Sequence, residues 1–495
     1  MQHRLLEAIQ RGFVPAAPAA KGNAWALVIG DLMLDRYLWG KVERVSPEAP
    51  VPVVLLDKEN FRPGGAANVA ANLAGLGLPC KLLGCVGADD DGRQLVEAVQ
   101  LAGVQTDAII TLPQRPTITK TRIVGGHQQM LRLDRESGAP FSADELQLLQ
   151  AGIRNAIAAA PAIIILSDYA KGVLHPDVCQ LAIRLAREAG IPVLGDPKGR
   201  DYAKYVGATA LTPNKRETAD ACDVAGDDTE ALLAAAEKLR NCLKLDFLAV
   251  TRSEEGISLL EDGATHHIPA MARQVFDVSG AGDTVIATLA AGMVAGLSHH
   301  EALHLANLAA GIVVGKVGTV PITREELLAE LANEDVREQA DKVCDLPRLL
   351  ARVAAWRAAG QRIVFTNGCF DLLHAGHVTY LEAARKAGDR LVLGLNTDAS
   401  VRALKGEGRP VIHEQDRARV LAALEAVDAV ILFGEETPLK LITAVKPDVL
   451  AKGSDYTENQ VVGSTEVKSW GGHVALIPIV PGRSTSAMIK VIEQI

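Results

Sequence analysis

Short apolar runs that end in glycine or aspartate recur along the chain, and each is followed by a segment with the apolar spacing of a helix. In the first two thirds these runs cover residues 25–31, 80–90, 162–168, 191–197 and 247–252. Strands that alternate with helices predict parallel βαβ units. Because ligands bind beyond the carboxyl ends of such strands, the first candidates for a functional site are Asp31, Asp168, Asp196 and Arg252.

A second series of apolar runs follows a charged interruption. Between Asn333 and Asp345 seven of thirteen residues are charged and no strand pattern is present. Beyond a helical segment, new runs cover residues 362–368, 390–398, 429–434, 448–453 and 473–480. The pattern predicts an α/β domain over 1–335, a charged linker with a leading helix over 336–361, and a smaller α/β domain over 362–495.

Composition narrows the class of protein. Hydrophobic residues make up 48% of the 495 residues and charged residues 22%, which excludes a disordered chain. A net charge of −9 argues against a nucleic-acid partner. The seven cysteines form no Cys-x-x-Cys pair, and no uncharged stretch reaches the roughly 20 residues that cross a bilayer. We therefore expect a cytoplasmic protein with no membrane partner.

The strongest local signal in the first domain begins at Phe276. Gly280, Ala281 and Gly282 directly precede an apolar helix, so their backbone N–H groups can converge on an anion. Asp283 would repel that anion unless it takes a proton from a hydroxyl that attacks a phosphate. We interpret Asp283 as a general base, the alternative being an ordinary capped helix start.

Three weaker signals accompany it. Asp31 and Asp35 follow the first strand and offer acceptors for sugar hydroxyls, although aspartate at a strand end is also a common turn former. Gly64 and Gly65 precede a small-residue helix that carries Asn68, where a sugar can approach closely. Asn214 and Glu217 are spaced to face a phosphate or Mg²⁺-bound water together, or simply to cap a helix.

In this order the four signals resemble the ribokinase-like (PfkB) carbohydrate kinases over residues 20–335. The resemblance implies a ribokinase-like fold with a small β lid, a homodimer formed through this domain, and ATP-dependent phosphorylation of a sugar hydroxyl. It implies an anion hole at residues 280–283, and Mg²⁺ held by Glu217 through water. The ATP-binding residues would be Asn214, Lys215, Arg216, Glu217, Gly280, Ala281 and Gly282. One departure is that only two residues separate Gly65 from Asn68.

A sugar that already carries a phosphate requires local cations in an acidic chain. The segment from residue 120 to 135 and the motif after the third strand supply Lys120, Arg122 and Lys171 as candidates. The alternative is that these charges lie on a solvated strand face.

The second domain carries His374 and His377 where a strand turns into a helix. Two imidazoles at a helix N-terminus can neutralise the charge that develops on a triphosphate as pyrophosphate leaves, and Gly376 between them lets the nucleotide approach. A zinc site would need a third ligand. Further residues at strand ends, in a glycine-spaced loop and at the start of the last helix complete the predicted nucleotide site: Asn367, Gly368, Phe370, Asn396, Asp398, Lys405, Arg409, Lys452, Asp455, Ser484 and Thr485.

This half resembles the cytidylyltransferase-like nucleotidyltransferases over residues 362–495, whose His-x-Gly-His signature matches His374, Gly376 and His377. The resemblance implies a Rossmann-like fold. The late Ser/Thr motif of that family is replaced here by Arg483-Ser484-Thr485-Ser486.

Together the two halves resemble the bifunctional bacterial heptose 7-phosphate kinase/heptose 1-phosphate adenylyltransferases of lipopolysaccharide core synthesis. The resemblance implies that ATP converts D-glycero-β-D-manno-heptose 7-phosphate to the 1,7-bisphosphate, and that ATP and heptose 1-phosphate give ADP-heptose and pyrophosphate. A separate 7-phosphatase would have to act between these steps. Two alternatives remain open: another sugar phosphate with CTP as donor, and a non-catalytic nucleotide-sensing regulator.

Overall fold

The computed structural model describes residues 1–14, 24–126, 128–270 and 275–478, and divides the chain into two compact units. The units are Met1–Leu331 and Ala332–Ile495. Helix α10 (Arg324–Asp341) crosses this division, so the charged stretch that begins at Asn333 is helical as far as Asp341. The α/β class predicted from the sequence is confirmed in both units.

A nine-stranded sheet forms the centre of the first unit, in the order β13-β12-β11-β10-β9-β8-β1-β4-β5. The strands from β11 to β5 in this order are parallel, whereas β12 and β13 form an antiparallel edge. The bounds are β1 (Ala26–Gly30), β4 (Cys80–Gly87), β5 (Ile109–Leu112), β8 (Ile163–Ser167), β9 (Val193–Asp196), β10 (Ala210–Leu211), β11 (Phe247–Thr251), β12 (Ile257–Glu261) and β13 (Ala264–Ile268).

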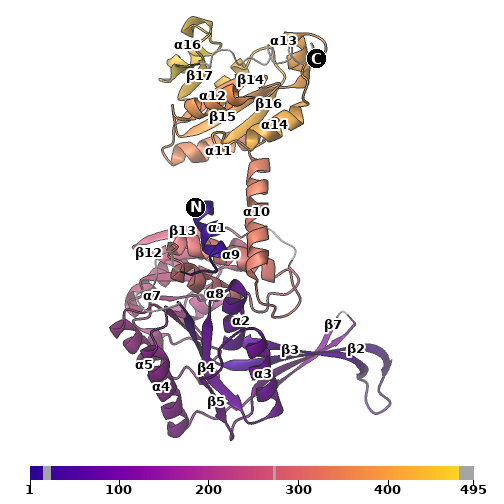
Figure 1. Cartoon of the computed structure of the whole chain (residues 1–495), viewed down its shortest axis with the longest axis vertical. Coiled ribbons are helices and arrows are strands. Elements are labelled where there is room, and N and C mark those ends of the chain that lie inside the picture. The colour runs from indigo at the N-terminus through magenta and orange to yellow at the C-terminus, as the bar shows by residue number, and fades with distance from the viewer. Residues whose placement is uncertain (15–23, 127, 271–274, 479–495) are drawn as a thin grey trace. The chain divides into compact units, whose positions relative to one another are not determined.

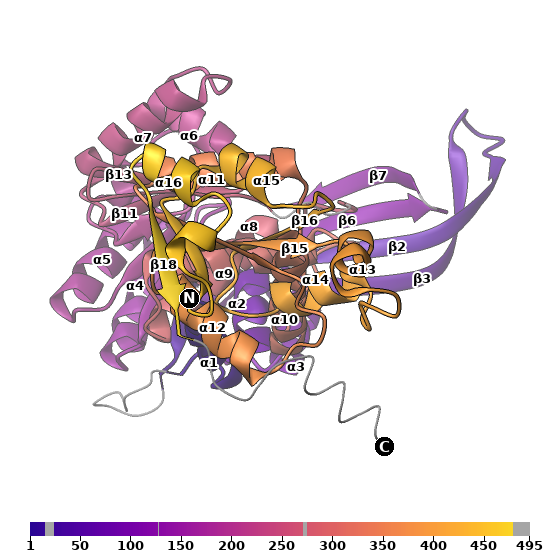
Figure 2. The same ribbon diagram turned by 90° about the horizontal axis from the view of Figure 1, so that it is seen from above.

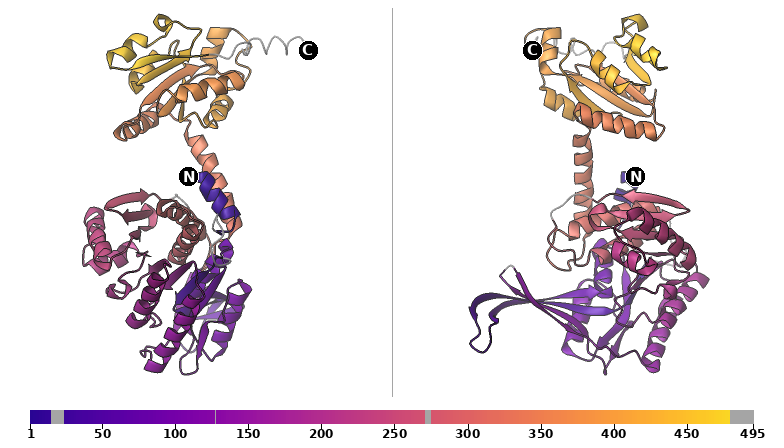
Figure 3. Two further views of the ribbon diagram at one scale, coloured as in Figure 1. Left: turned by 60° about the vertical axis from the view of Figure 1, so that its left-hand side comes forward. Right: turned by 180° about the vertical axis from the view of Figure 1, so that it is seen from behind.

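Helices cover both faces of this sheet (Figure 3). One face packs against α1 (Gln2–Gln10), α2 (Ala66–Leu76), α3 (Asp90–Leu101), α8 (Ala281–Val294) and α9 (His299–Val313). The other packs against α4 (Ala143–Ala158), α5 (Pro176–Glu188) and α7 (Thr229–Leu243). Burial on both faces explains why the strands are continuous apolar runs. Among the described residues, no helix is long and apolar enough to cross a membrane.

A second sheet, the lid, projects from the first unit (Figure 1) and has the order β3-β2-β6-β7. Its strands are β2 (Leu32–Val45), β3 (Pro52–Gly65), β6 (Ile118–Gly125) and β7 (Gln128–Arg135). Strand β2 continues almost directly from β1, and β3 leads into α2, so the lid begins and ends beside the carboxyl edge of the central sheet. This sheet is the small β lid that the resemblance implied.

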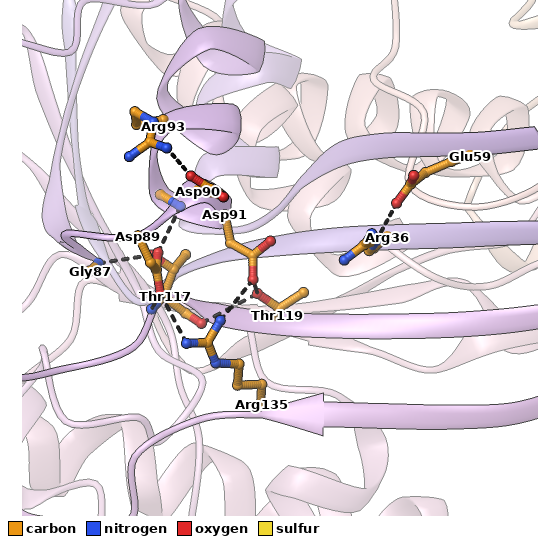
Figure 4. Close-up of polar contacts among 11 residues, drawn as sticks. Arg36, Glu59, Gly87, Asp89, Asp90, Asp91, Arg93, Thr117, Thr119 and Arg135 are labelled. Carbon is orange, nitrogen blue, oxygen red and sulfur yellow. Dashed lines mark hydrogen bonds and ion pairs between the residues drawn. The ribbon is translucent and has the colours of Figure 1, made fainter.

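Polar contacts fasten the lid to the first turn of α3 (Figure 4). The Asp89 carboxylate caps the helix by accepting from the Gly92 N–H at 3.0 Å. It also accepts from the backbone N–H and the hydroxyl of Thr117, just before β6, at 3.0 and 2.6 Å. At the end of β7, Arg135 forms ion pairs with Asp89 at 3.5 Å and Asp91 at 3.2 Å. The base of the lid is therefore fixed to the core.

The second unit contains a five-stranded parallel sheet in the order β16-β15-β14-β17-β18. Its strands are β14 (Ile363–Gly368), β15 (Arg390–Asn396), β16 (Ala429–Phe433), β17 (Val449–Gly453) and β18 (His473–Ile477). The strand order reverses at β14, and open α/β sheets bind ligands beside such a switch point. The end of β14 is therefore where a site is expected.

Helices also cover both faces of this smaller sheet (Figure 2). One face packs against α11 (Leu346–Ala358), α15 (Leu439–Val445) and α16 (Ser464–Ser469). The other packs against α12 (Ala375–Arg385) and α14 (Glu414–Ala422), while α13 (Asp398–Lys405) follows β15. All five predicted strand runs of this half form the sheet.

Candidate active sites

Asp283 lies in the first turn of α8 and is only 2% exposed. One of its oxygens, Oδ2, accepts a hydrogen bond from the Asn68 amide at 2.7 Å, and the other, Oδ1, accepts from the Tyr169 hydroxyl at 2.7 Å. Burial raises the pKa of Asp283 to about 6, against the two hydrogen bonds, which lower it. The carboxylate is ionised at neutral pH and can accept a proton.

The turn before Asp283 requires glycine. Gly280 is the N-cap of α8 and has φ of +79°, a left-handed conformation that favours glycine. A Cβ at this position would lie 2.7 Å from Nδ2 of Asn68. The Asp277 carboxylate shapes the same turn by accepting the backbone N–H groups of Ser279 and Gly318, both at 2.9 Å. These contacts fix the turn at the start of α8, in which the Ala281 N–H donates to the Val278 carbonyl oxygen at 3.2 Å, and the anion hole at residues 280–282 stays a prediction.

Asp31, which we expected to bind the sugar, is fully buried. Its carboxylate accepts three backbone N–H groups, from Tyr169 at 2.9 Å, Lys171 at 3.0 Å and Val173 at 3.1 Å. These bonds hold the loop after β8 in place. The oxygens of Asp31 are occupied by this loop, because the end of β1 lies beside the end of β8 in the sheet.

Asp35 lies on the lid side of the same site and is 3% exposed. Its carboxylate accepts from Arg122 of β6 at 2.5 Å and from the Thr319 hydroxyl at 3.3 Å. The backbone at Gly64 and Gly65 lies close to Asp35 and Asp31. A Cβ at Gly64 would lie 2.6 Å from Oδ2 of Asp35, and one at Gly65 would lie 2.5 Å from the Asp31 carbonyl oxygen.

The three predicted phosphate-binding cations differ in their partners. Arg122 pairs with Asp35, and Lys171 pairs with Glu136 at 2.7 Å. Lys120 lies with its ammonium 5.4 Å from the centre of the Tyr169 ring. Burial lowers the pKa of Lys120, with Asp35 opposing and Arg122 adding to that effect. Its charge also favours the ionised form of Asp283, so the structure brings Lys120 close to the base.

Asn214 and Glu217 form a capping box at the start of α6 (Lys215–Cys222). The Glu217 N–H donates to the Asn214 side chain at 2.9 Å, and the Asn214 N–H donates to the Glu217 carboxylate at 3.0 Å. Glu217 also pairs with Lys198 at 2.5 Å. The helix-cap alternative is therefore realised. Asn214, Lys215 and Arg216 nevertheless line an open hollow of about 580 Å³.

Three carboxylates of the first unit interact with one another, which bears on the expected Mg²⁺. Burial raises the pKa of Asp196 well above its usual value, and the charges of Asp283 and Glu217 raise it further. Such crowding of carboxylates fits a divalent cation. No three His, Cys, Asp or Glu side chains in the described ranges are arranged to ligate a metal directly. The Glu217 carboxylate itself is bonded to the Asn214 N–H and to Lys198, so its expected contact with Mg²⁺ stays a prediction.

In the second unit, His374 caps α12 and His377 lies in its first turn. Their rings stack with centroids 3.9 Å apart, and the Phe370 ring meets His377 edge-on at 5.1 Å. Burial, together with the charges of His374 and Lys405, lowers the pKa of His377 to about 4. His377 is thus a neutral imidazole at physiological pH. Gly376 lies between the two histidines in the same turn.

Lys452 lies near the end of β17 and beside the end of β14, because these two strands pair. Its ammonium donates to the Asn367 carbonyl oxygen at 3.2 Å. Burial lowers the pKa of Lys452 to about 8, and the charge of Asp455 opposes this shift. Gly368 gives the Phe370 ring room, since a Cβ there would lie 2.8 Å from it. The structure therefore gathers these predicted residues at the switch point.

Asp398 and Arg409 are held by internal ion pairs. Asp398 accepts from Arg417 at 2.6 Å, and Arg409 pairs with Asp371. Arg417 is 2% exposed and also donates to the Cys369 carbonyl oxygen at 2.5 Å. Asn396 donates to the Ser400 hydroxyl at 3.2 Å. Ser484 and Thr485 lie outside the described residues.

Two residues at these sites were not among the sequence candidates. Tyr169 bonds the proposed base, and its only sequence signal is its place directly after a strand run that ends in aspartate. Arg417 lies within α14, where arginine in an amphipathic helix gives no signal of its own. Tertiary contacts alone bring these side chains to the sites.

Comparison with known proteins assigns each of the two units to a protein family. Residues 24–325 match the model of the pfkB family of carbohydrate kinases, and residues 365–490 match the cytidylyltransferase-like model. The bifunctional protein HldE of Methylobacillus flagellatus is 65% identical over 99% of both chains. That of Magnetococcus marinus is 58% identical over 94% of this chain and 96% of its own.

Solved structures agree in the fold of the first unit. Arabidopsis thaliana ribokinase, complexed with ribose and ATP, is 23% identical over 62% of this chain and 98% of its own, with a TM-score of 0.50. Escherichia coli phosphofructokinase-2, in complex with potassium, is 17% identical over 63% and 98%, with a TM-score of 0.53. The chain belongs to the family of bifunctional HldE proteins and joins a pfkB-type carbohydrate kinase to a cytidylyltransferase-like nucleotidyltransferase.

Proposed function

We propose that the chain catalyses two ATP-dependent reactions of ADP-heptose synthesis for the lipopolysaccharide core. The first converts D-glycero-β-D-manno-heptose 7-phosphate to the 1,7-bisphosphate. The second joins heptose 1-phosphate to the adenylyl group of ATP and releases pyrophosphate. The observation that carries this assignment is the full-length match, at 65% identity, to a bifunctional HldE protein that combines the same two units.

In the kinase reaction, the C1 hydroxyl of the heptose attacks the γ-phosphorus of ATP. Asp283 takes the hydroxyl proton as the new O–P bond forms and the bond to ADP breaks. Backbone N–H groups of the turn at residues 280–282, at the N-terminal end of α8, receive the charge that develops on the phosphoryl oxygens. Mg²⁺ bound with ATP would neutralise phosphate charge, held by Glu217 through water.

The sugar phosphate fits the side of the site formed by the lid. Asp35 accepts hydrogen bonds there, and Asn68 reaches the same space from α2. Lys120 and Arg122 of β6 and Lys171 of the loop after β8 supply positive charge, although Arg122 also pairs with Asp35 and Lys171 with Glu136. We assign the 7-phosphate to these cations, because their charge is of the right sign and Lys120 acts on Asp283.

In the transferase reaction, a phosphate oxygen of heptose 1-phosphate attacks the α-phosphorus of ATP. His374 and His377, at the N-terminal end of α12, receive the charge that builds on the triphosphate as the bond to pyrophosphate breaks. The buried Lys452 adds a cation beside the end of β14. No covalent intermediate with the protein is needed.

Other proteins take part in the pathway. The kinase product carries two phosphates, whereas the transferase uses a sugar that carries only the 1-phosphate, so a separate 7-phosphatase acts between them. We place the enzyme in the cytoplasm, where ATP is available to both reactions.

The kinase unit also has features of a homodimer. Exposed large apolar side chains gather on the lid strands and their connections, namely Val42, Val45, Val51, Leu55, Leu56, Met130, Leu131 and Leu133. Such a concentration marks an interaction surface. We assign a second copy of the chain to it.

A direct test is to incubate the protein with heptose 7-phosphate or heptose 1-phosphate, each with ATP or CTP. With heptose 7-phosphate and ATP, we expect ADP to form. With heptose 1-phosphate, we expect pyrophosphate and ADP-heptose when ATP is the donor and no product when CTP is the donor. Turnover of the second sugar with CTP would favour the cytidylyl alternative. Turnover of neither sugar would contradict the heptose assignment.

A further inference from the structure

The loop after β8 brings a tyrosine hydroxyl to the kinase site. Tyr169 donates from its hydroxyl to Oδ1 of Asp283 at 2.7 Å, while Asn68 donates to Oδ2 at 2.7 Å. Each carboxylate oxygen therefore has one acceptor direction occupied by the protein and another left for a substrate hydroxyl. The two donors approach from different elements, α2 and the β8 loop, so together they fix the plane of the carboxylate.

The loop that carries Tyr169 is itself held in place by Asp31, at the end of β1. The fully buried Asp31 accepts the backbone N–H groups of Tyr169, Lys171 and Val173 at 2.9, 3.0 and 3.1 Å. A carboxylate with three such bonds leaves the loop little freedom. The carboxylate at the end of β1 thus determines where the Tyr169 ring stands.

We propose that Tyr169 is a positioning residue of the kinase, holding the carboxylate of the base in the orientation that receives the sugar proton, and that Asp31 acts through Tyr169. The proposal rests on the proposed function of Asp283 as the base. It gives Asp31 a role in the kinase that needs no contact with the sugar.

The charged groups around the carboxylate decide what loss of the hydroxyl does. Asp35 and Asp196 lie near Asp283 and oppose its ionised form, whereas Lys120, above the Tyr169 ring, favours it. The Tyr169 hydrogen bond also favours the ionised form. Without the Tyr169 hydrogen bond, the effect of Asp35 and Asp196 is less opposed. The pKa of Asp283 should therefore rise, so that Asp283 stays protonated to a higher pH.

The test is Tyr169→Phe in the full chain, with kinase kcat measured between pH 5.5 and 9. One hydrogen bond to a charged group predicts a fall in kcat of about 10- to 100-fold. We expect the fall to be larger at pH 6 than at pH 8.5, with the acidic limb of the profile moved upward. KM for ATP and the transferase activity should stay unchanged.

Tyr202→Phe is the matched control, because the buried Tyr202 hydroxyl has no hydrogen-bond partner among the described residues of the same unit. It should leave kcat and the pH profile unchanged. Asn68→Ala removes the other donor to Asp283 and should move the acidic limb in the same direction as Tyr169→Phe. This second variant keeps the test open if Tyr169→Phe fails to fold.

An acidic limb that stays in place in both Tyr169→Phe and Asn68→Ala would overturn the proposal, as would a wild-type kcat in Tyr169→Phe. Asp283→Asn separates this failure from that of the proposed function. If Asp283→Asn is inactive while Tyr169→Phe is normal, the base assignment stands and only the role of Tyr169 falls. Full kinase activity in Asp283→Asn would contradict both.

Discussion

The environment of Asp283 sets the working range of the kinase. Burial opposes the charge of this carboxylate more strongly than the bonds from Asn68 and Tyr169 favour it, so its pKa lies at about 6. Below that pH the carboxyl holds a proton and cannot accept another. The same burial makes the ionised form a stronger base at neutral pH than an exposed aspartate.

We expect Asp283→Asn to lower kinase kcat by about 10²- to 10⁴-fold, the usual contribution of a general base. Transferase activity should be retained, because His374 and His377 belong to the other unit. In the wild type, kcat/KM of the kinase should rise with pH through about 6 as Asp283 loses its proton. Coupled assays of both activities at several pH values measure this, and loss of both activities in the variant would contradict the assignment.

His377 should act in the transferase as a neutral group. Its pKa is lowered to about 4, so the imidazole carries no charge between pH 6 and 8 and donates only through an N–H. We expect His377→Ala to lower transferase kcat by about 10²- to 10³-fold, as loss of a donor to a developing anion does. Kinase activity in the same protein is the internal control.

The pH profile of pyrophosphate release distinguishes this role from a cationic one. His377 should contribute no titration between pH 6 and 8. A wild-type profile that falls through pH 6.5 and becomes flat in His377→Ala would show a cationic histidine and contradict the expectation.

At the scale of elements, prediction from sequence succeeded where a strand is buried on both faces. In β1, Ala26 and Val28 face one core and Leu27 and Ile29 the other, which produces an unbroken apolar run. Strand β10 has only two residues, too few to form an apolar run, and was not predicted from the sequence. All eight residues of β7 are exposed, so its sequence resembles a loop and the lid was expected only from the resemblance.

Prediction of the site was uneven for related reasons. Asp283, His374 and His377 lie at helix N-termini, where local sequence fixes the position of a side chain. Tyr169 depends on contacts with Asp31 and Asp283, which are distant in sequence. The carboxylate of Asp31 was visible in the sequence, but its partner loop was not.

The link between α3 and the lid should contribute to the stability of the kinase unit. We expect Asp89→Ala to destabilise it by about 1–2 kcal/mol through loss of the N-cap, which lowers the melting temperature by roughly 2–4 °C. Asp90→Ala is the matched control, since this neighbouring carboxylate is exposed and pairs only with Arg93 among the described residues. Differential scanning calorimetry measures both, and equal shifts in the two variants would refute a special role for Asp89.

On the scale of the whole molecule, a net charge of −9 is compatible with two sites for phosphates. In the proposed reactions, helix N-termini, neutral imidazoles and a few loop cations receive the phosphate groups locally. The global charge therefore excludes a nucleic-acid binder more firmly than it excludes a phosphate-handling enzyme.

The proposed homodimer belongs to this scale. We expect Leu55→Lys and Leu133→Lys together to convert a dimer to a monomer, because they place charge on the exposed apolar surface of the lid. Leu101→Lys is the control, since Leu101 is 82% exposed on α3, outside the lid. Sedimentation equilibrium gives the mass of each protein. A wild-type monomer, or a double variant that stays dimeric, would contradict the proposal.

The most direct measurement of the two-reaction account follows heptose 7-phosphate and ATP over time by ³¹P NMR, with and without an added 7-phosphatase. The account predicts that the 1,7-bisphosphate accumulates in the absence of the phosphatase and that ADP-heptose and pyrophosphate form only in its presence. ADP-heptose without the phosphatase, or no phosphorylation at C1, would contradict it.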